Sequence, residues 1–168
     1  MRTPILACLF TSLALTAAPA QTASVTLFGT GCTYMSQPLA IGVQGLPQFG
    51  TMVSVTYTGP NLNNQLSIQP VLALGLAPTN IPIPATILPQ QPLGCTQWIV
   101  PELLTLMPPT ATGMFETHLD LTIPNDPTLA GFTFTAQWLA IVIQCGIVAP
   151  CWLQALPTSD AALLTVGL

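Results

Sequence analysis

A sharp turn at residues 123–131 leads directly into the longest apolar strand candidate of the chain, residues 132–143. Two prolines fix φ within the turn, and the Asn-Asp pair between them can accept hydrogen bonds from nearby backbone amides. Gly131 then permits a backbone angle that other residues resist. The pattern predicts a chain reversal followed by one long strand.

Within this strand, apolar residues from Phe132 to Trp138 alternate with Thr133, Thr135 and Gln137. A two-residue period indicates a strand with one apolar face and one solvent-facing polar face. Towards its end both faces become apolar, so we expect that end to be covered on both sides. The apolar run is far shorter than the roughly 20 residues that a membrane-spanning helix needs, so no membrane span is predicted.

Further short alternating segments, separated by proline and glycine turns, indicate more strands. Pro70 favours an edge position or a bulge for the strand that contains it, and the proline-rich residues 77–94 are expected to form an extended crossover. No segment of the mature chain has the pattern of an amphipathic helix. About eight strands with regular turns therefore predict an all-β fold, an antiparallel β-sandwich of the jelly-roll kind. Besides 132–143, strands are expected at residues 24–28, 39–44, 51–58, 66–76, 95–100, 114–123, 151–156 and 161–168.

The N-terminus has the pattern of a secretion signal. Arg2 supplies the positive charge, residues 5–17 are mostly apolar, and residues 18–20 read Ala-Pro-Ala, a small-x-small cleavage pattern. We expect residues 1–20 to be removed and residues 21–168 to form one domain, secreted or held at the cell surface.

The charge of the chain is unusually low. The full sequence contains one basic residue of the Lys and Arg types, Arg2, so the mature chain contains no Lys and no Arg. It carries only five acidic residues and one histidine. Nucleic-acid binding needs a basic footprint, and so do phosphate clamps and patches for anionic membranes. These partners are therefore excluded, whereas the apolar content of 51% argues against disorder.

Four cysteines remain in the mature chain: Cys32, Cys95, Cys145 and Cys151. Four cysteines allow three pairings, and a secreted chain favours disulfides over free thiols. Cys145 and Cys151 bracket a short loop, so a local bridge between them is the natural choice, which leaves Cys32 to pair with Cys95. A zinc site would need closely spaced cysteine pairs, which the chain lacks.

Several short motifs occur in a specific order and spacing over nearly the whole mature chain. In that arrangement they resemble an uncharacterised secreted domain that recurs in extracellular proteins of planctomycete-like bacteria. The resemblance implies an exported, disulfide-bearing β-domain without a known activity, and it supports the Cys32–Cys95 pair. The motifs are Phe28-Gly29-Thr30-Gly31-Cys32, Pro38-Leu39, Leu93-Gly94-Cys95, Ile123-Pro124-Asn125-Asp126-Pro127, Leu129-Ala130-Gly131, Gln137 and Ser159-Asp160-Ala161.

The chain departs from this pattern at three places. Thr86 stands where an Asp is expected, and Asp160 stands where an Asn is expected. Cys145 and Cys151 look like an addition, so the second bridge rests on spacing alone.

Glu116, His118 and Asp120 occupy alternate positions of one predicted strand, so their side chains share a face. Histidine and carboxylates are suitable ligands for a divalent metal. However, side chains two positions apart on a strand lie roughly 7 Å from each other, which is wide for shared ligation by short groups. The favoured interpretation is the solvent-exposed face of a strand, with a metal site as the weaker alternative.

The sequence does not indicate an enzyme or a cofactor. A glycosidase would need two acids facing each other across a cleft, and Glu116 with Asp120 is the only close pair on one predicted face. A serine triad would have His118 as its only base, and no serine lies in a Gly-x-Ser-x-Gly turn.

Two functions from different classes remain open. The first is a non-catalytic structural or interaction module of the cell exterior that self-associates, because the chain has no lysine to protect its sheet edges. The alternative is a glycan-binding β-sandwich. Its stacking platform would use Trp98, Trp152 and Tyr34, whereas Trp138 is expected in the core. Exposed, coplanar tryptophans among polar residues would favour the glycan site, and buried tryptophans with an apolar outer face would favour the module.

Overall fold

The computed structural model describes residues 21–60, 66–108, 116–145 and 150–168. Within these ranges the chain forms strands and one short 3-10 turn, η1, without an α-helix. The predicted signal segment, residues 1–20, lies outside the described residues. The strands are β1 (Ser24–Phe28), β2 (Thr33–Tyr34), β3 (Gln37–Pro38), β4 (Ala40–Gln44), β5 (Met52–Thr58), β6 (Leu66–Gly75), β7 (Pro78–Pro82), β8 (Thr96–Ile99), β9 (Leu103–Leu106), β10 (Glu116–Thr122), β11 (Thr133–Gln144), β12 (Trp152–Ala155) and β13 (Thr158–Thr165), and η1 spans Pro127–Leu129.

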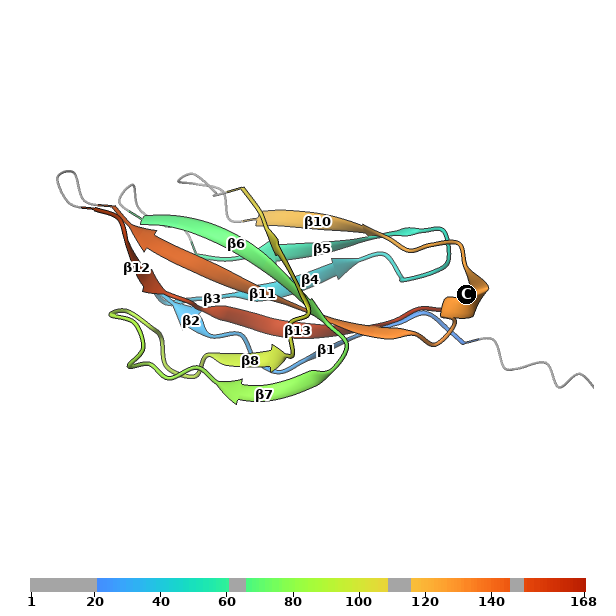
Figure 1. Cartoon of the computed structure of the whole chain (residues 1–168), viewed down its shortest axis with the longest axis horizontal. Helices are drawn as coiled ribbons and strands as arrows, with labels where there is room; N and C mark the ends of the chain where they lie inside the picture. The colour runs from blue at the N-terminus through green and yellow to red at the C-terminus, as the bar shows by residue number, and fades with distance from the viewer. Residues whose placement is uncertain (1–20, 61–65, 109–115, 146–149) are drawn as a thin grey trace, which may run out of the picture.

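These strands pair into two main antiparallel sheets (Figure 1). The six-stranded sheet has the order β1-β13-β11-β6-β9, and β12 also pairs with β11. The three-stranded sheet has the order β10-β5-β4, and two short hairpins, β2-β3 and β7-β8, complete the described elements. The all-β, antiparallel class predicted from the sequence is confirmed. The described chain has thirteen strands rather than about eight, because the expected loops contain short pairing segments.

The long strand β11 organises the core, as its sequence pattern indicates. It pairs with β6 over ten positions and with β13 on its other side. Trp138 of β11 is fully buried, and its ring meets that of Tyr57 of β5 edge-on, with the centroids 5.7 Å apart. Because Val53 and Val55 of β5 are also fully buried, the main core lies between the two main sheets.

The other face of β11 is also covered, which contradicts the expectation that it is wet. Thr135 and Gln137 are fully buried rather than solvent-facing. The hydroxyl of Thr135 donates a 2.9 Å hydrogen bond to the carbonyl of Gly75. The β7–β8 hairpin lies over this face, where Ile99 packs in a second apolar cluster with Ala73 of β6. Hydrogen bonds thus compensate for burying these polar side chains.

Pro70 does not lie in an edge strand, which corrects the expectation from the sequence. Its strand, β6, has β11 on one side and β9 on the other. The carbonyl of Pro70 accepts a hydrogen bond from the backbone N–H of Met107, just beyond β9. The N and C=O of one residue point to the same side of an antiparallel strand, so the nitrogen of Pro70 also faces β9. The hydrogen bond that proline cannot donate is therefore lost at the end of the short β9, and the hydrogen bonds between β6 and β11 are not interrupted.

The turn before β11 has the predicted chemistry. Asp126 caps η1, and its Oδ1 accepts hydrogen bonds from the backbone N–H of Thr128 at 2.9 Å and from the Thr128 hydroxyl at 2.8 Å. These two bonds, the backbone one first, lower the pKa of the Asp126 carboxyl. Gly131 follows with a φ of 79°, in the left-handed region that favours glycine.

Both predicted disulfides are present. The Cys32–Cys95 bridge links residues 63 positions apart, and the Cys145–Cys151 bridge closes a loop with a separation of 6. Cys32 and Cys95 are buried, and Cys32 Sγ accepts a 3.0 Å hydrogen bond from the backbone N–H of Thr158 in β13. The long-range bridge therefore fastens the start of β8 and the β1–β2 connection to the main sheet.

Candidate interaction site

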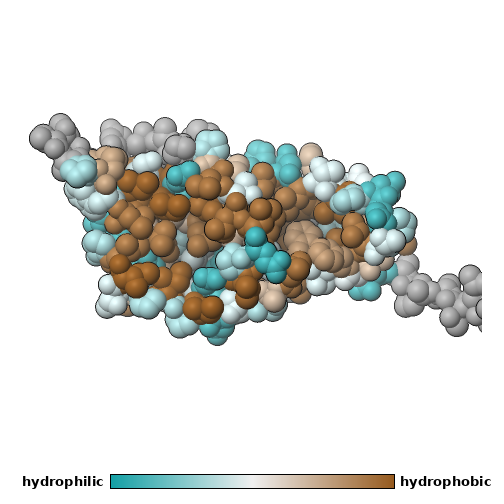
Figure 2. Space-filling model, viewed as in Figure 1, coloured by the Kyte–Doolittle hydropathy of each residue, from teal (hydrophilic) through white to brown (hydrophobic). Residues whose placement is uncertain are grey.

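The short strand β9 forms one free edge of the six-stranded sheet and is unusually apolar for such a position. Leu103, Leu104 and Leu106 are 56%, 55% and 60% exposed. We call these three leucines with Thr105 between them the β9 edge. Figure 2 shows apolar side chains gathered over much of the face on which β6 and β11 lie. Proteins commonly blunt free edges with charges, and the β9 edge carries none.

The hydrogen-bond phase of β9 shows which backbone groups face outward. The N–H of Met107 donates to the carbonyl of Pro70 at 2.9 Å, so Met107 faces β6. In an antiparallel ladder this orientation alternates, and hence Thr105 also faces β6. The backbone N–H and C=O groups of Leu104 and Leu106 therefore point away from β6, on the side where no described strand pairs with β9.

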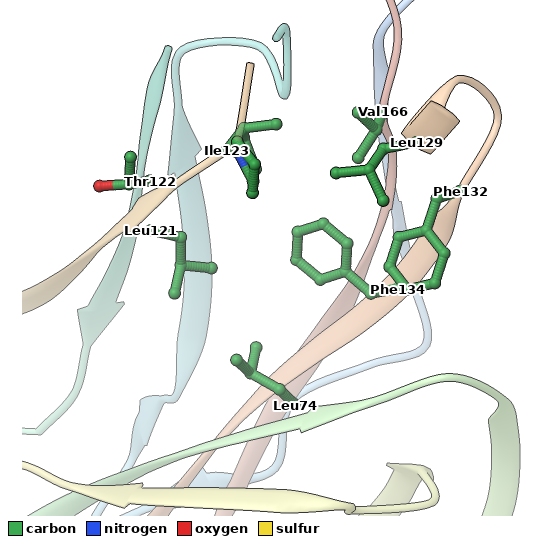
Figure 3. A pocket seen from close by; sticks show the side chains of 9 residues that line it. Leu74, Leu121, Thr122, Ile123, Leu129, Phe132, Phe134 and Val166 are labelled. Atoms are coloured by element: carbon green, nitrogen blue, oxygen red, sulfur yellow. The ribbon is translucent and has the colours of Figure 1, made fainter. Parts of the chain in front are cut away.

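An apolar groove opens between the two main sheets (Figure 3). Its larger part has a volume of about 330 Å³, and a neighbouring part of about 200 Å³ reaches Leu103. Leu74 and Phe134 line both parts. In Figure 3, Phe134 and Leu121 point into the same space from β11 and β10. Because Leu121 belongs to one main sheet and Leu74 and Phe134 belong to the other, the groove lies between the two sheets.

Two of the other sheet edges, β10 and β4, are less suited to pairing. β10 presents exposed Glu116 and Asp120, whose charges oppose close approach of a like strand. On β4, the backbone N–H of Ile41 already donates to Oδ1 of Asp160 at 2.9 Å. The remaining edge of the six-stranded sheet, β1, is also uncharged but exposes one large apolar side chain, Leu27, whereas β9 exposes three leucines. The β9 edge is therefore the best candidate site for a contact with another molecule.

The predicted Glu116, His118 and Asp120 face exists as expected. The three side chains are exposed on β10 and alternate with half-buried Thr117 and Leu119. Their cross-strand partners on β5 are hydroxyl residues, since His118 lies opposite Thr56. Among the described residues, no group of three or more acid, histidine or cysteine side chains is placed to hold a metal ion. The arrangement is that of a hydrated outer face.

The predicted aromatic residues are not brought together as one exposed surface. Tyr34 is buried in the main core, where its hydroxyl donates to Oε1 of Gln90 at 3.1 Å, and burial raises its pKa. Trp98 packs in the second cluster and donates from Nε1 to the carbonyl of Thr30. Only Trp152 is exposed, by 40%, and Trp138 lies in the core as expected.

Strand β9 is not predicted from the sequence, which indicates no strand between residues 100 and 114. A signal was present: Leu103 to Met107 is an apolar run between Pro101 and Pro108. The run is only five residues long, and one strand of that length is hard to distinguish from a loop without knowledge of its partner.

The comparisons with known proteins identify no relative: no protein-family model, curated protein or solved structure matches the chain. In the part of the chain that the structure describes, no helix is long and apolar enough to cross a membrane.

Proposed function

We propose that this chain is a non-catalytic, secreted structural module of the cell exterior that works by associating with copies of itself. In this proposal its two main sheets form an antiparallel β-sandwich of the jelly-roll kind, open on the side of β9 and β10. The proposal extends the resemblance to exported β-domains, which itself remains a prediction.

The observation that carries the proposal is the β9 edge. It combines exposed leucines with outward-facing backbone groups, and the mature chain has no Lys or Arg to prevent pairing. A strand edge of this kind can bind another strand through backbone hydrogen bonds and apolar contacts. The buried disulfide between Cys32 and Cys95 is compatible with an oxidising location.

The glycan-binding alternative has less support. A sugar platform needs exposed aromatic rings, and Trp152 is the one exposed tryptophan among the described residues. Tyr34 and Trp98 pack in different apolar clusters, so they cannot form one flat surface with Trp152. The apolar outer face around β9 fits a protein contact better than a sugar.

Sedimentation of the oxidised mature chain, residues 21–168, tests the proposal. We expect oligomers at high micromolar concentration that persist when the salt concentration is raised, because apolar and backbone contacts depend weakly on salt. A clean monomer in both low and high salt would contradict self-association.

A further inference from the structure

We propose that the partner of the β9 edge is the β9 edge of a second copy, paired antiparallel about a two-fold axis at Thr105. This inference rests on the proposed self-association and specifies its geometry. The two six-stranded sheets would then join into one continuous sheet across the dimer. The interface is isologous, so the same residues contribute from both copies.

The outward-facing backbone groups determine the register. Leu104 and Leu106 present free N–H and C=O groups, and Thr105 does not. A two-fold axis at Thr105 places Leu104 of one copy opposite Leu106 of the other, and this occurs twice by symmetry. Both pairs are then hydrogen-bonded pairs, so all four outward-facing residues of the two strands are satisfied.

The sequence of the strand is self-complementary about the same residue. The segment reads Leu103-Leu104-Thr105-Leu106-Met107, so apolar residues stand on both sides of Thr105. The two-fold arrangement sets leucine against leucine on one face and Thr105 against Thr105 on the other. Opposed threonines can form a hydrogen bond across two strands, and opposed leucines remove apolar surface from water.

Charge also favours a second copy. The charged residue nearest to the β9 edge in the sequence is Glu102, which precedes the strand. In this register Glu102 lies opposite Pro108 of the other copy, so the two glutamates stand at opposite ends of the interface. A partner strand with basic residues would gain little here, because the β9 edge itself has no carboxylate to bind them. An uncharged apolar strand fits best, and the chain itself carries one.

Cysteine cross-linking tests the register directly. At the two-fold axis the Thr105 residues form a non-hydrogen-bonded pair, whose Cα atoms lie about 4.5 Å apart, and a disulfide spans about 4.4–6.8 Å. We expect Thr105→Cys in the mature chain to give a covalent dimer under oxidised glutathione at micromolar concentration. The native cysteines are already bridged, so the added thiol is the reactive one.

Leu104→Cys is the matched control. Residues 104 of the two copies are diagonal neighbours about 7–8 Å apart, too far for a disulfide. We expect this variant to remain uncross-linked, whereas a mixture of Leu104→Cys with Leu106→Cys gives the heterodimer. Cross-linking of Leu104→Cys alone, with none for Thr105→Cys, would place the axis elsewhere and overturn the proposed register.

Leu104→Lys provides a test that does not depend on oxidation. A lysine at the edge should raise the dimer dissociation constant by at least about tenfold in sedimentation, because a charge would replace the leucine that faces Leu106 of the other copy in the proposed dimer. Leu93→Lys, at a side chain that is 85% exposed outside β9, should leave the constant unchanged. If the chain forms oligomers, but Leu104→Lys does not change the dissociation constant and Thr105→Cys does not cross-link, the β9 pairing is refuted and the proposed self-association is not. If the native chain is a monomer, both proposals are refuted.

Discussion

Gln137 illustrates how a single buried polar side chain can connect three strands. Its Nε2 donates hydrogen bonds to the carbonyls of Thr96 at 2.9 Å and Ser159 at 2.8 Å. Its Oε1 accepts a 2.9 Å hydrogen bond from the backbone N–H of Trp98. Gln137 therefore connects β8 and β13 to β11 in a fully buried position. Such a network contributes most when every member is paired, as it is here.

We expect Gln137→Leu to destabilise the folded chain by at least about 2 kcal/mol, because it leaves one N–H and two carbonyls without their buried partner. Urea unfolding of the oxidised protein measures the change. Gln44→Leu is the control, since Gln44 is an exposed glutamine of β4 and its replacement should cost no more than about 0.5 kcal/mol. Equal effects of the two substitutions would show that the Gln137 network contributes little.

At the scale of elements, the β7–β8 hairpin is fastened to the turn after β1. Trp98 of β8 lies against Gly29, so that a Cβ built at Gly29 would overlap Cε2 of the indole. The indole Nε1–H donates to the carbonyl of Thr30 in the same turn. In the loop between β7 and β8, Nε2 of Gln91 donates a 3.1 Å hydrogen bond to the carbonyl of Leu156, and Oε1 of Gln91 accepts a 2.7 Å hydrogen bond from the backbone N–H of Leu156. The hairpin thus packs on a glycine turn and is held by side-chain bonds.

The pair Gly29→Ala and Gly94→Ala separates packing from backbone strain. Both glycines have positive φ, at 73° and 77°, so each alanine should cost about 1 kcal/mol for the backbone. At Gly94 no heavy atom lies within 4 Å of the added Cβ, whereas at Gly29 the indole must move. We expect Gly29→Ala to cost at least about 1 kcal/mol more than Gly94→Ala in urea unfolding, as in other overpacked sites. Equal costs would contradict the close packing of Trp98.

At the scale of the whole molecule, the two disulfides should contribute unequally to stability. In the loop-entropy description, the bridge with a separation of 63 contributes about 4 kcal/mol and the one with a separation of 6 about 2 kcal/mol. We therefore expect replacement of Cys32 and Cys95 by alanine to lower the free energy of unfolding more than replacement of Cys145 and Cys151. Urea unfolding of the two double variants measures this, and the reverse order would count against the entropic account.

Much of the fold is local and could be predicted. The alternation in β5 and β10 correctly assigned their faces, since Val53, Val55 and Tyr57 are buried and Glu116, His118 and Asp120 are exposed. The turn at Asp126 and the two cysteine pairs also followed from residue type and spacing. These features depend on neighbours along the chain or on a small number of possible pairings.

The candidate site was predicted far less well. Self-association was expected from the lack of lysine and arginine, but no strand could be chosen. Strand β9 lies at the sheet edge because it is the outer neighbour of β6, whose inner neighbour is β11. The pairing of β6 with β11 joins segments about 70 positions apart in the chain. For a similar reason the structure does not bring the three aromatic residues together on one exposed surface, because the partners that bury Tyr34 and Trp98 are distant in sequence.

Residue periodicity therefore established which side chains share a face and the all-β class, and cysteine spacing established the disulfide plan. It could not establish what covers each face or which strand is left at an edge. Thr135 and Gln137 have the pattern of a wet face, yet they are buried because the β7–β8 hairpin lies over them. Leu103, Leu104 and Leu106 have the composition of a core, yet they are exposed. Both outcomes depend on long-range strand pairing, whose free energy is shared among residues far apart in the chain and leaves no local pattern.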